Sequence, residues 1–98
     1  MEVGRGYCLY VLIWLNMKTY ILDVRSPDEY KAGCREGAIN LPMDELFENS
    51  EYAVSILKNI EKDDSIHVYC FSGGRASMAK NILESMGYVK VINLGGLQ

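Results

Sequence analysis

Short apolar runs alternate along the chain with segments that carry helical periodicity. Four runs of five or six residues predict buried strands, at residues 20–24, 37–41, 65–70 and 89–94. Helical segments separate them, so the pattern predicts an α/β domain with a mainly parallel sheet. The glycine pair at residues 95–96 predicts a turn after the last strand.

The first helix has a recognisable start and end. Ser26 is followed by Pro27 and Glu29, a capping box that predicts a short helix ending at Gly33. Arg25 precedes the cap, and we expect an exposed ion pair between Arg25 and Glu29, worth under about 1 kcal/mol.

Two further helical segments follow in the middle of the chain. Residues 43–47 predict one turn after the strand at 37–41. Ser50 predicts the start of a second helix, with an apolar stripe of Val54, Leu57 and Ile60.

The strand at 65–70 ends in a cysteine that leads into a loop. Cys70 is followed by Phe71, Ser72, Gly73, Gly74 and Arg75. A helix is predicted over residues 76–86, with Gly87 as its left-handed cap. Backbone N–H groups, the helix dipole and the Arg75 charge would all favour a thiolate, so Cys70 is the candidate nucleophile.

His67 is a poor candidate for a base that activates this thiol. It lies three residues before Cys70, and side chains alternate faces along a strand, so the two are expected to point in opposite directions. We interpret His67 as a half-buried sheet residue.

The spacing between Cys70 and Arg75 separates two reactions. A phosphoryl group needs a wider loop, with the arginine at the position that Ala76 occupies here. The tighter loop favours transfer of a single sulfur atom over hydrolysis of a phosphate ester.

Composition narrows the classes of partner. The 98 residues, 49% hydrophobic, fit one small domain, and the ten Lys and Arg residues form no basic stripe, so no nucleic-acid partner is expected. Cys8, Cys34 and Cys70 form no CxxC pair and only one histidine is present, which argues against a disulfide framework and a zinc site. No metal and no cofactor are expected. A reducing, cytoplasmic location is expected, with the bacterial periplasm as the alternative.

Residues 1–19 are interpreted as an apolar extension and residues 20–98 as the domain. The apolar run at 7–15 is shorter than the roughly 20 residues of a membrane-spanning helix, and no small-residue cleavage site follows it. We expect no membrane span; the run is a buried strand or cap, or Met17 is the natural start.

Several segments together resemble the single-domain rhodanese-like sulfurtransferases, including the small thiosulfate sulfurtransferases of bacteria. The resemblance covers residues 20–97. Its matching segments are Leu22-Asp-Val-Arg25 with Glu29-Tyr30, and residues 37–42, 68–75 and 87–97.

The resemblance implies a three-layer, rhodanese-like fold, with a mainly parallel five-stranded sheet flanked by helices. It implies that Cys70 carries a persulfide and that the backbone of residues 71–75 cradles it. Arg75 would attract a small anionic sulfur donor. Asp23, Arg25 and Glu29 match scaffold positions and are expected to give structural support.

The chain also departs from this family. Cys34 stands where a histidine is usual; we expect an ordinary, partly buried cysteine, with a second functional thiol as the alternative. The aromatic residue and helix that often follow the double glycine are missing, and residues 1–19 replace the usual first helix and strand. Thin cover of one sheet face is therefore expected, in a monomer or weak dimer.

Three functions remain open at this point. The leading hypothesis is a sulfurtransferase that moves a sulfane sulfur from an anionic donor such as thiosulfate, through Cys70, to a thiophilic acceptor such as a protein or thiol. The alternative is a persulfide carrier or interaction module with little turnover. The third is a phosphatase or arsenate-reductase-like enzyme.

Overall fold

The computed structural model describes residues 18–96. The apolar run at 7–15, Cys8 and the proposed start at Met17 lie outside the described residues.

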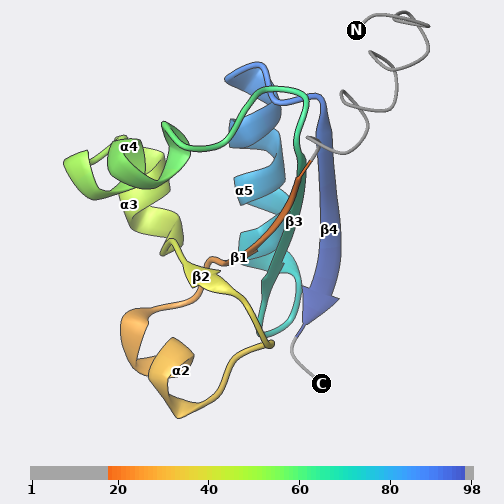
Figure 1. Cartoon of the computed structure of the whole chain (residues 1–98). Helices are drawn as coiled ribbons and strands as arrows, with labels where there is room; N and C mark the ends of the chain where they lie inside the picture. Colours follow the sequence, from red (N-terminus) through yellow and green to blue (C-terminus); the bar gives the residue numbers. More distant parts are fainter. Residues whose placement is uncertain (1–17, 97–98) are drawn as a thin grey trace, which may run out of the picture.

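The described residues contain one sheet of four parallel strands in the order β2-β1-β3-β4 (Figure 1). The strands are β1 (Thr19–Asp23), β2 (Ile39–Asn40), β3 (Ser65–Cys70) and β4 (Lys90–Gly96). The prediction of a parallel α/β sheet is confirmed, and all four strands lie within or next to the predicted apolar runs. The fifth strand that the resemblance implied is not among residues 18–96.

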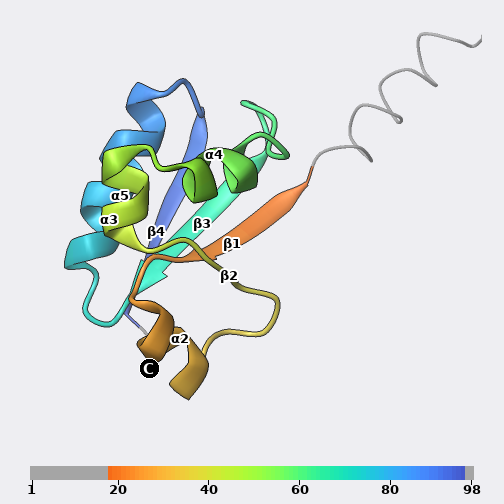
Figure 2. The same cartoon turned by 90° about the vertical axis from the view of Figure 1, so that its left-hand side faces the viewer.

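Four helices accompany the sheet: α2 (Pro27–Ala32), α3 (Met43–Glu48), α4 (Glu51–Leu57) and α5 (Gly74–Ser85). Figures 1 and 2 show α3, α4 and α5 on one side of the sheet and α2 near the carboxyl ends of the strands. No helix in the described part of the chain is long and apolar enough to cross a membrane.

The core lies between the sheet and the three helices on that side. Leu22 and Val68 from the sheet and Leu83 from α5 are fully buried there. Of the stripe predicted for the second middle helix, Leu57 is buried in α4 and Ile60 is buried beyond the end of the helix, but Val54 is 46% exposed. Val54 lies on the outer side of a helix too short to bury a second face.

The predicted caps are confirmed. The Ser26 hydroxyl accepts a hydrogen bond from the Glu29 N–H, and the Glu29 carboxylate accepts one from the Ser26 N–H. The Ser50 hydroxyl caps α4 through the Ala53 N–H. Gly87 has a φ of 104°, in the left-handed region that favours glycine.

Two boundaries differ from the prediction. Helix α5 begins at Gly74, two residues early, because Gly73 supplies the left-handed conformation that starts it. Gly95 and Gly96 continue β4 and form no turn, because a register shift after Val68 keeps them paired with Tyr69 and Cys70. Helix α5 therefore begins within the Cys70 loop, and β4 pairs with β3 as far as Cys70.

Candidate active site

Cys70 is the last residue of β3, and its sulfur faces the N-terminus of α5. The Gly73 N–H donates to Cys70 Sγ at 2.8 Å and the Ala76 N–H donates at 3.4 Å. Gly73 has a φ of 96°, a conformation that a residue with a side chain adopts at a cost. The helix dipole and two N–H donors therefore meet at one sulfur atom, an arrangement that stabilises negative charge on it.

The end of β4 packs against the Cys70 loop. A Cβ atom on Gly96 would clash with the backbone carbonyl of Phe71, so only glycine allows the two segments to approach this closely. The Asn93 side-chain amide donates to the Gly73 carbonyl at 3.3 Å. The sequence does not predict this support; its only local signal is the glycine pair, which by itself predicts a turn.

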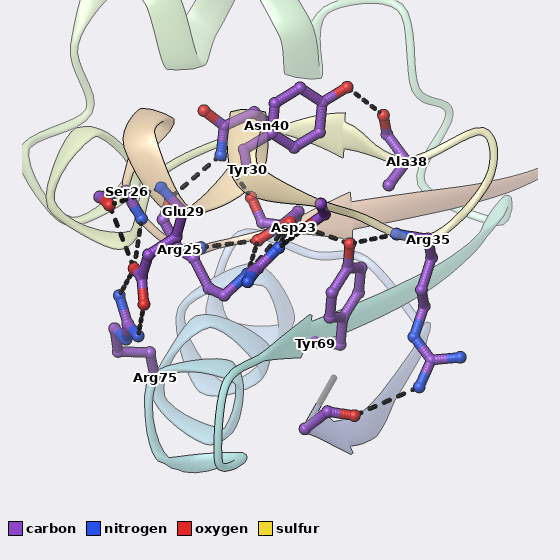
Figure 3. Close-up of polar contacts among 12 residues, drawn as sticks. Asp23, Arg25, Ser26, Glu29, Tyr30, Arg35, Ala38, Asn40, Tyr69 and Arg75 are labelled. Carbon is purple, nitrogen blue, oxygen red and sulfur yellow. Dashed lines mark hydrogen bonds and ion pairs between the residues drawn. The ribbon is translucent and has the colours of Figure 1, made fainter. Parts of the chain in front are cut away.

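Arg75 lies in the first turn of α5 and forms a two-fold ion pair with Glu29. Its Nη1 donates to Glu29 Oε1 at 2.8 Å and its Nη2 donates to Oε2 at 3.1 Å (Figure 3). The hydrogen bonds from Arg75, and then those from Ser26, lower the pKa of Glu29 to about 2. The pair is solvent-accessible, with side chains 41% and 36% exposed.

The predicted ion pair between Arg25 and Glu29 is therefore wrong. Arg25 instead turns inward to Asp23, and its Nη2 lies 2.7 Å from Asp23 Oδ2. The Arg25 Nε and backbone N–H each donate to Asp23 Oδ1 at 3.0 Å. Asp23 is fully buried, and a buried charge is costly unless an opposite charge lies beside it. Arg25 therefore pairs with Asp23 and not with Glu29.

Tyr69 completes this buried cluster from the strand that carries Cys70. Its hydroxyl donates to Asp23 Oδ2 at 2.9 Å and accepts from the Arg35 N–H at 2.8 Å. Burial alone would raise the pKa of Asp23, but the hydrogen bonds from Arg25 and Tyr69 outweigh it and lower that pKa. We call Asp23, Arg25 and Tyr69 the buried cluster.

Arg35 links the buried cluster to the end of β4. Its guanidinium lies 5.0 Å from the Tyr69 ring centroid, and its Nη2 donates to the Gly96 carbonyl at 3.3 Å. Neither Tyr69 nor Arg35 was selected from the sequence. Tyr69 precedes Cys70 and points to the other face of the sheet, which was the available signal.

The other residues considered in the sequence analysis differ in their exposure to solvent. Phe71 is 65% exposed and Ser72 is exposed, so their side chains are available to a substrate or partner. His67 is half-buried, as expected. Cys34 is exposed, contrary to the expectation of a partly buried residue, because it lies in the loop between α2 and β2. Residues 18–96 hold no group of three side chains suited to bind a metal ion.

These contacts define a class of protein: a parallel α/β domain with a cysteine at a strand end, held by backbone N–H groups. The family model of the rhodanese-like domain matches residues 11–98 of this chain. The chain belongs to the rhodanese-like family.

Individual relatives agree with this assignment. The chain is 42% identical over 77 residues to thiosulfate sulfurtransferase PspE of Escherichia coli, covering 79% of this chain and 69% of the relative. A solved E. coli rhodanese with anions matches with a TM-score of 0.69 at 38% identity, over 81% of this chain and 87% of that one. The human single-domain sulfurtransferase TSTD1 matches with a TM-score of 0.66 at 26% identity, over 95% and 87%.

Proposed function

We propose that the protein is a sulfurtransferase that carries sulfane sulfur as a persulfide on Cys70. The observation that carries the proposal is the pair of N–H groups, from Gly73 and Ala76, that donate to Cys70 Sγ. A persulfide anion carries the same single negative charge on its outer sulfur, and the same dipolar loop stabilises either state. The names of the relatives, two of which are sulfurtransferases, support this choice.

The reaction has two half-reactions. The Cys70 thiolate attacks the outer sulfur of thiosulfate; a sulfur–sulfur bond forms to Cys70, the original sulfur–sulfur bond breaks, and sulfite leaves with the electron pair. An acceptor such as cyanide then attacks the outer sulfur of the persulfide, which yields thiocyanate and regenerates the thiolate. No net proton or electron is needed, which fits a loop with no base beside the sulfur in the described residues.

Arg75 is the residue that would draw an anionic donor toward the loop. Arg75 directly precedes Ala76, whose N–H donates to Cys70 Sγ. Its guanidinium forms an ion pair with Glu29. Asp23 and Arg25 act through the scaffold, because both are buried away from solvent. We therefore assign catalysis to Cys70, donor binding to Arg75 and residues 71–74, and support to the buried cluster.

The test is thiocyanate formation from thiosulfate and cyanide. Wild type should turn over, Cys70→Ser should lose at least about a thousandfold of the rate, and Cys34→Ser, an exposed matched cysteine, should retain it. Activity that survives in Cys70→Ser would overturn the mechanism. A sulfur-loaded Cys70 without turnover would instead favour the persulfide-carrier function.

A further inference from the structure

The side chain of Asn93, in β4, reaches the Cys70 loop. Val91 of this strand is buried in the core, and α5 packs against β4 on that side. Because side chains alternate along a strand, Asn93 points to the same side as Val91. The end of β4 lies beside the start of α5 (Figure 1). Asn93 is half-buried there, and the reaction described above gives it no role.

The Asn93 amide forms two hydrogen bonds of opposite direction. Its Oδ1 accepts from the Gly95 N–H at 2.7 Å, and its Nδ2 donates to the Gly73 carbonyl at 3.3 Å. One partner is a donor and the other is an acceptor, so the side chain must supply both an acceptor and a donor. An amide does so, whereas a carboxylate or an apolar side chain does not. The amide therefore joins the end of β4 to the residue that precedes α5.

A register shift in β4 accompanies this contact. Asn93 pairs with Val68 of β3. The next pair joins Tyr69 to Gly95, so Leu94 is an extra residue and forms a β-bulge. A bulge bends its strand and re-aims the neighbouring side chains, and here it lies directly after Asn93.

Gly73 supplies the closer of the two N–H groups at the sulfur, at 2.8 Å from Cys70 Sγ against 3.4 Å for the other. Gly73 and Gly74 are adjacent, and glycine adopts many backbone conformations, so the pair does not by itself hold one. The Gly73 carbonyl is held from two sides, by the Ser77 N–H of α5 at 2.9 Å and by the Asn93 amide. Helix and strand together therefore hold Gly73 at its φ of 96°.

Building on the sulfurtransferase function above, we propose that Asn93 is a positioning residue for sulfur transfer. Its amide holds Gly73 in the conformation that directs the Gly73 N–H to Cys70 Sγ. Asn93 acts through Gly73 and is not a reacting group. The thiolate and the persulfide are both stabilised by the loop N–H groups, so both half-reactions depend on this contact.

The test compares two substitutions that remove different parts of the contact. Asn93→Asp keeps an acceptor for the Gly95 N–H but turns a carboxylate oxygen toward the Gly73 carbonyl, and Asn93→Ala removes both bonds. Sulfur loading of Cys70 by thiosulfate is followed as a gain of about 32 Da. At about pH 8 it should slow about tenfold in Asn93→Ala and about thirtyfold in Asn93→Asp, where repulsion adds to the lost bond. In steady state kcat should fall more than KM for thiosulfate rises.

Acid should partly rescue Asn93→Asp. A protonated carboxyl group has an O–H that donates to the Gly73 carbonyl as the amide does. The ordinary pKa of an aspartate is about 3.9, and an acceptor that pairs with the neutral form raises it. Glu29, with a pKa of about 2, stays charged above about pH 5. The ratio of variant to wild-type loading rates should therefore rise at least about threefold from about pH 8 to about pH 5 in Asn93→Asp and stay constant in Asn93→Ala.

Asn59→Asp is the matched control. The Asn59 side-chain amide also donates to a backbone carbonyl, that of Ser55, at 3.2 Å. Asn59 is exposed and lies between α4 and the amino end of β3, whereas Cys70 is at the carboxyl end of that strand. The substitution adds the same charge and should leave the loading rate unchanged.

The outcomes separate this proposal from the sulfurtransferase function. A loading rate within about twofold of wild type in Asn93→Asp at about pH 8, or a deficit that is equally large at about pH 5, overturns the positioning role, while loading in wild type leaves the function standing. Asn93→Asp carries this test alone if Asn93→Ala fails to fold. Alkylation of Cys70 by iodoacetamide needs no sulfur donor. Slower alkylation in Asn93→Asp, together with no sulfur loading in wild type, would support the role of Asn93 and overturn the sulfurtransferase function.

Discussion

Two ion pairs lie at the carboxyl end of the sheet, and they differ in almost every physical respect. The side chains of Asp23 and Arg25 are 0% and 5% exposed, whereas those of Glu29 and Arg75 are 36% and 41% exposed. Figure 3 shows the two pairs on neighbouring segments, joined through the short stretch from Arg25 to Glu29. The first pair is enclosed by protein, and the second meets solvent beside the Cys70 loop.

This difference separates support from binding. A buried pair is costly to break, because the partner left behind is a charge without water. An exposed pair contributes little to stability and can exchange its partner for an anion from solvent. The segment from Asp23 to Glu29 thus supplies both the buried pair and the carboxylate that pairs with the accessible guanidinium of Arg75.

The largest expected effect is loss of stability in Asp23→Asn. Removing the carboxylate leaves Arg25 buried without its counter-ion, so we expect a loss of about 3–5 kcal/mol in the free energy of unfolding. Glu29→Gln, the matched change in the exposed pair, should destabilise the protein far less. Denaturant unfolding measures both, and equal losses would contradict the contrast between the pairs.

The next effect is a dependence of stability on acid. Both carboxyl groups have pKa values lowered by folding, and that of Glu29 falls from 4.5 to about 2. A lowered pKa in the folded state gives stability that is present above the unfolded value and is lost as pH falls toward the folded value. Wild-type unfolding free energy should therefore decline between pH 4.5 and about 2.

Glu29→Gln sharpens this second prediction. The variant lacks the titrating group of the exposed pair, so its unfolding free energy should decline less steeply over the same interval. Parallel pH curves for wild type and Glu29→Gln would contradict the lowering of the Glu29 pKa by folding.

The smallest expected effect concerns donor binding. Glu29→Gln frees the Arg75 guanidinium and removes a nearby negative charge, so KM for thiosulfate should fall about threefold with kcat little changed. The matched control is Glu84→Gln, which removes the other exposed ion pair of α5, with Lys80. Steady-state kinetics measure both; a lower KM in the control as well would attribute the effect to net charge.

Much of the fold followed from local sequence signals. The apolar runs predicted the four strands, and the Ser26 capping box predicted α2, because strand burial and helix capping are decided by neighbouring residues. The identity of Cys70 as the residue held by backbone N–H groups followed equally from its position before two glycines and a helix.

The errors share a physical cause. The pairing of Glu29 with Arg75, the hydrogen bond from the Tyr69 hydroxyl to Asp23 and the need for glycine at position 96 all depend on segments far apart in the chain. The local spacing predicted a pair between Arg25 and Glu29. The structure pairs Arg25 with Asp23, because a fully buried carboxylate is costly without a counter-ion. Such choices are made by tertiary packing, which a single sequence does not display.

The central claim, that Cys70 carries sulfur covalently, is tested most directly by mass spectrometry of the protein after incubation with thiosulfate. Trypsin separates Cys70, in the peptide of residues 63–75, from Cys34, in the peptide of residues 32–35. We predict a gain of about 32 Da, one sulfur atom, on the Cys70 peptide, and its loss after cyanide is added. A gain on the Cys34 peptide alone, or an unmodified Cys70 while thiocyanate is produced, would contradict the account.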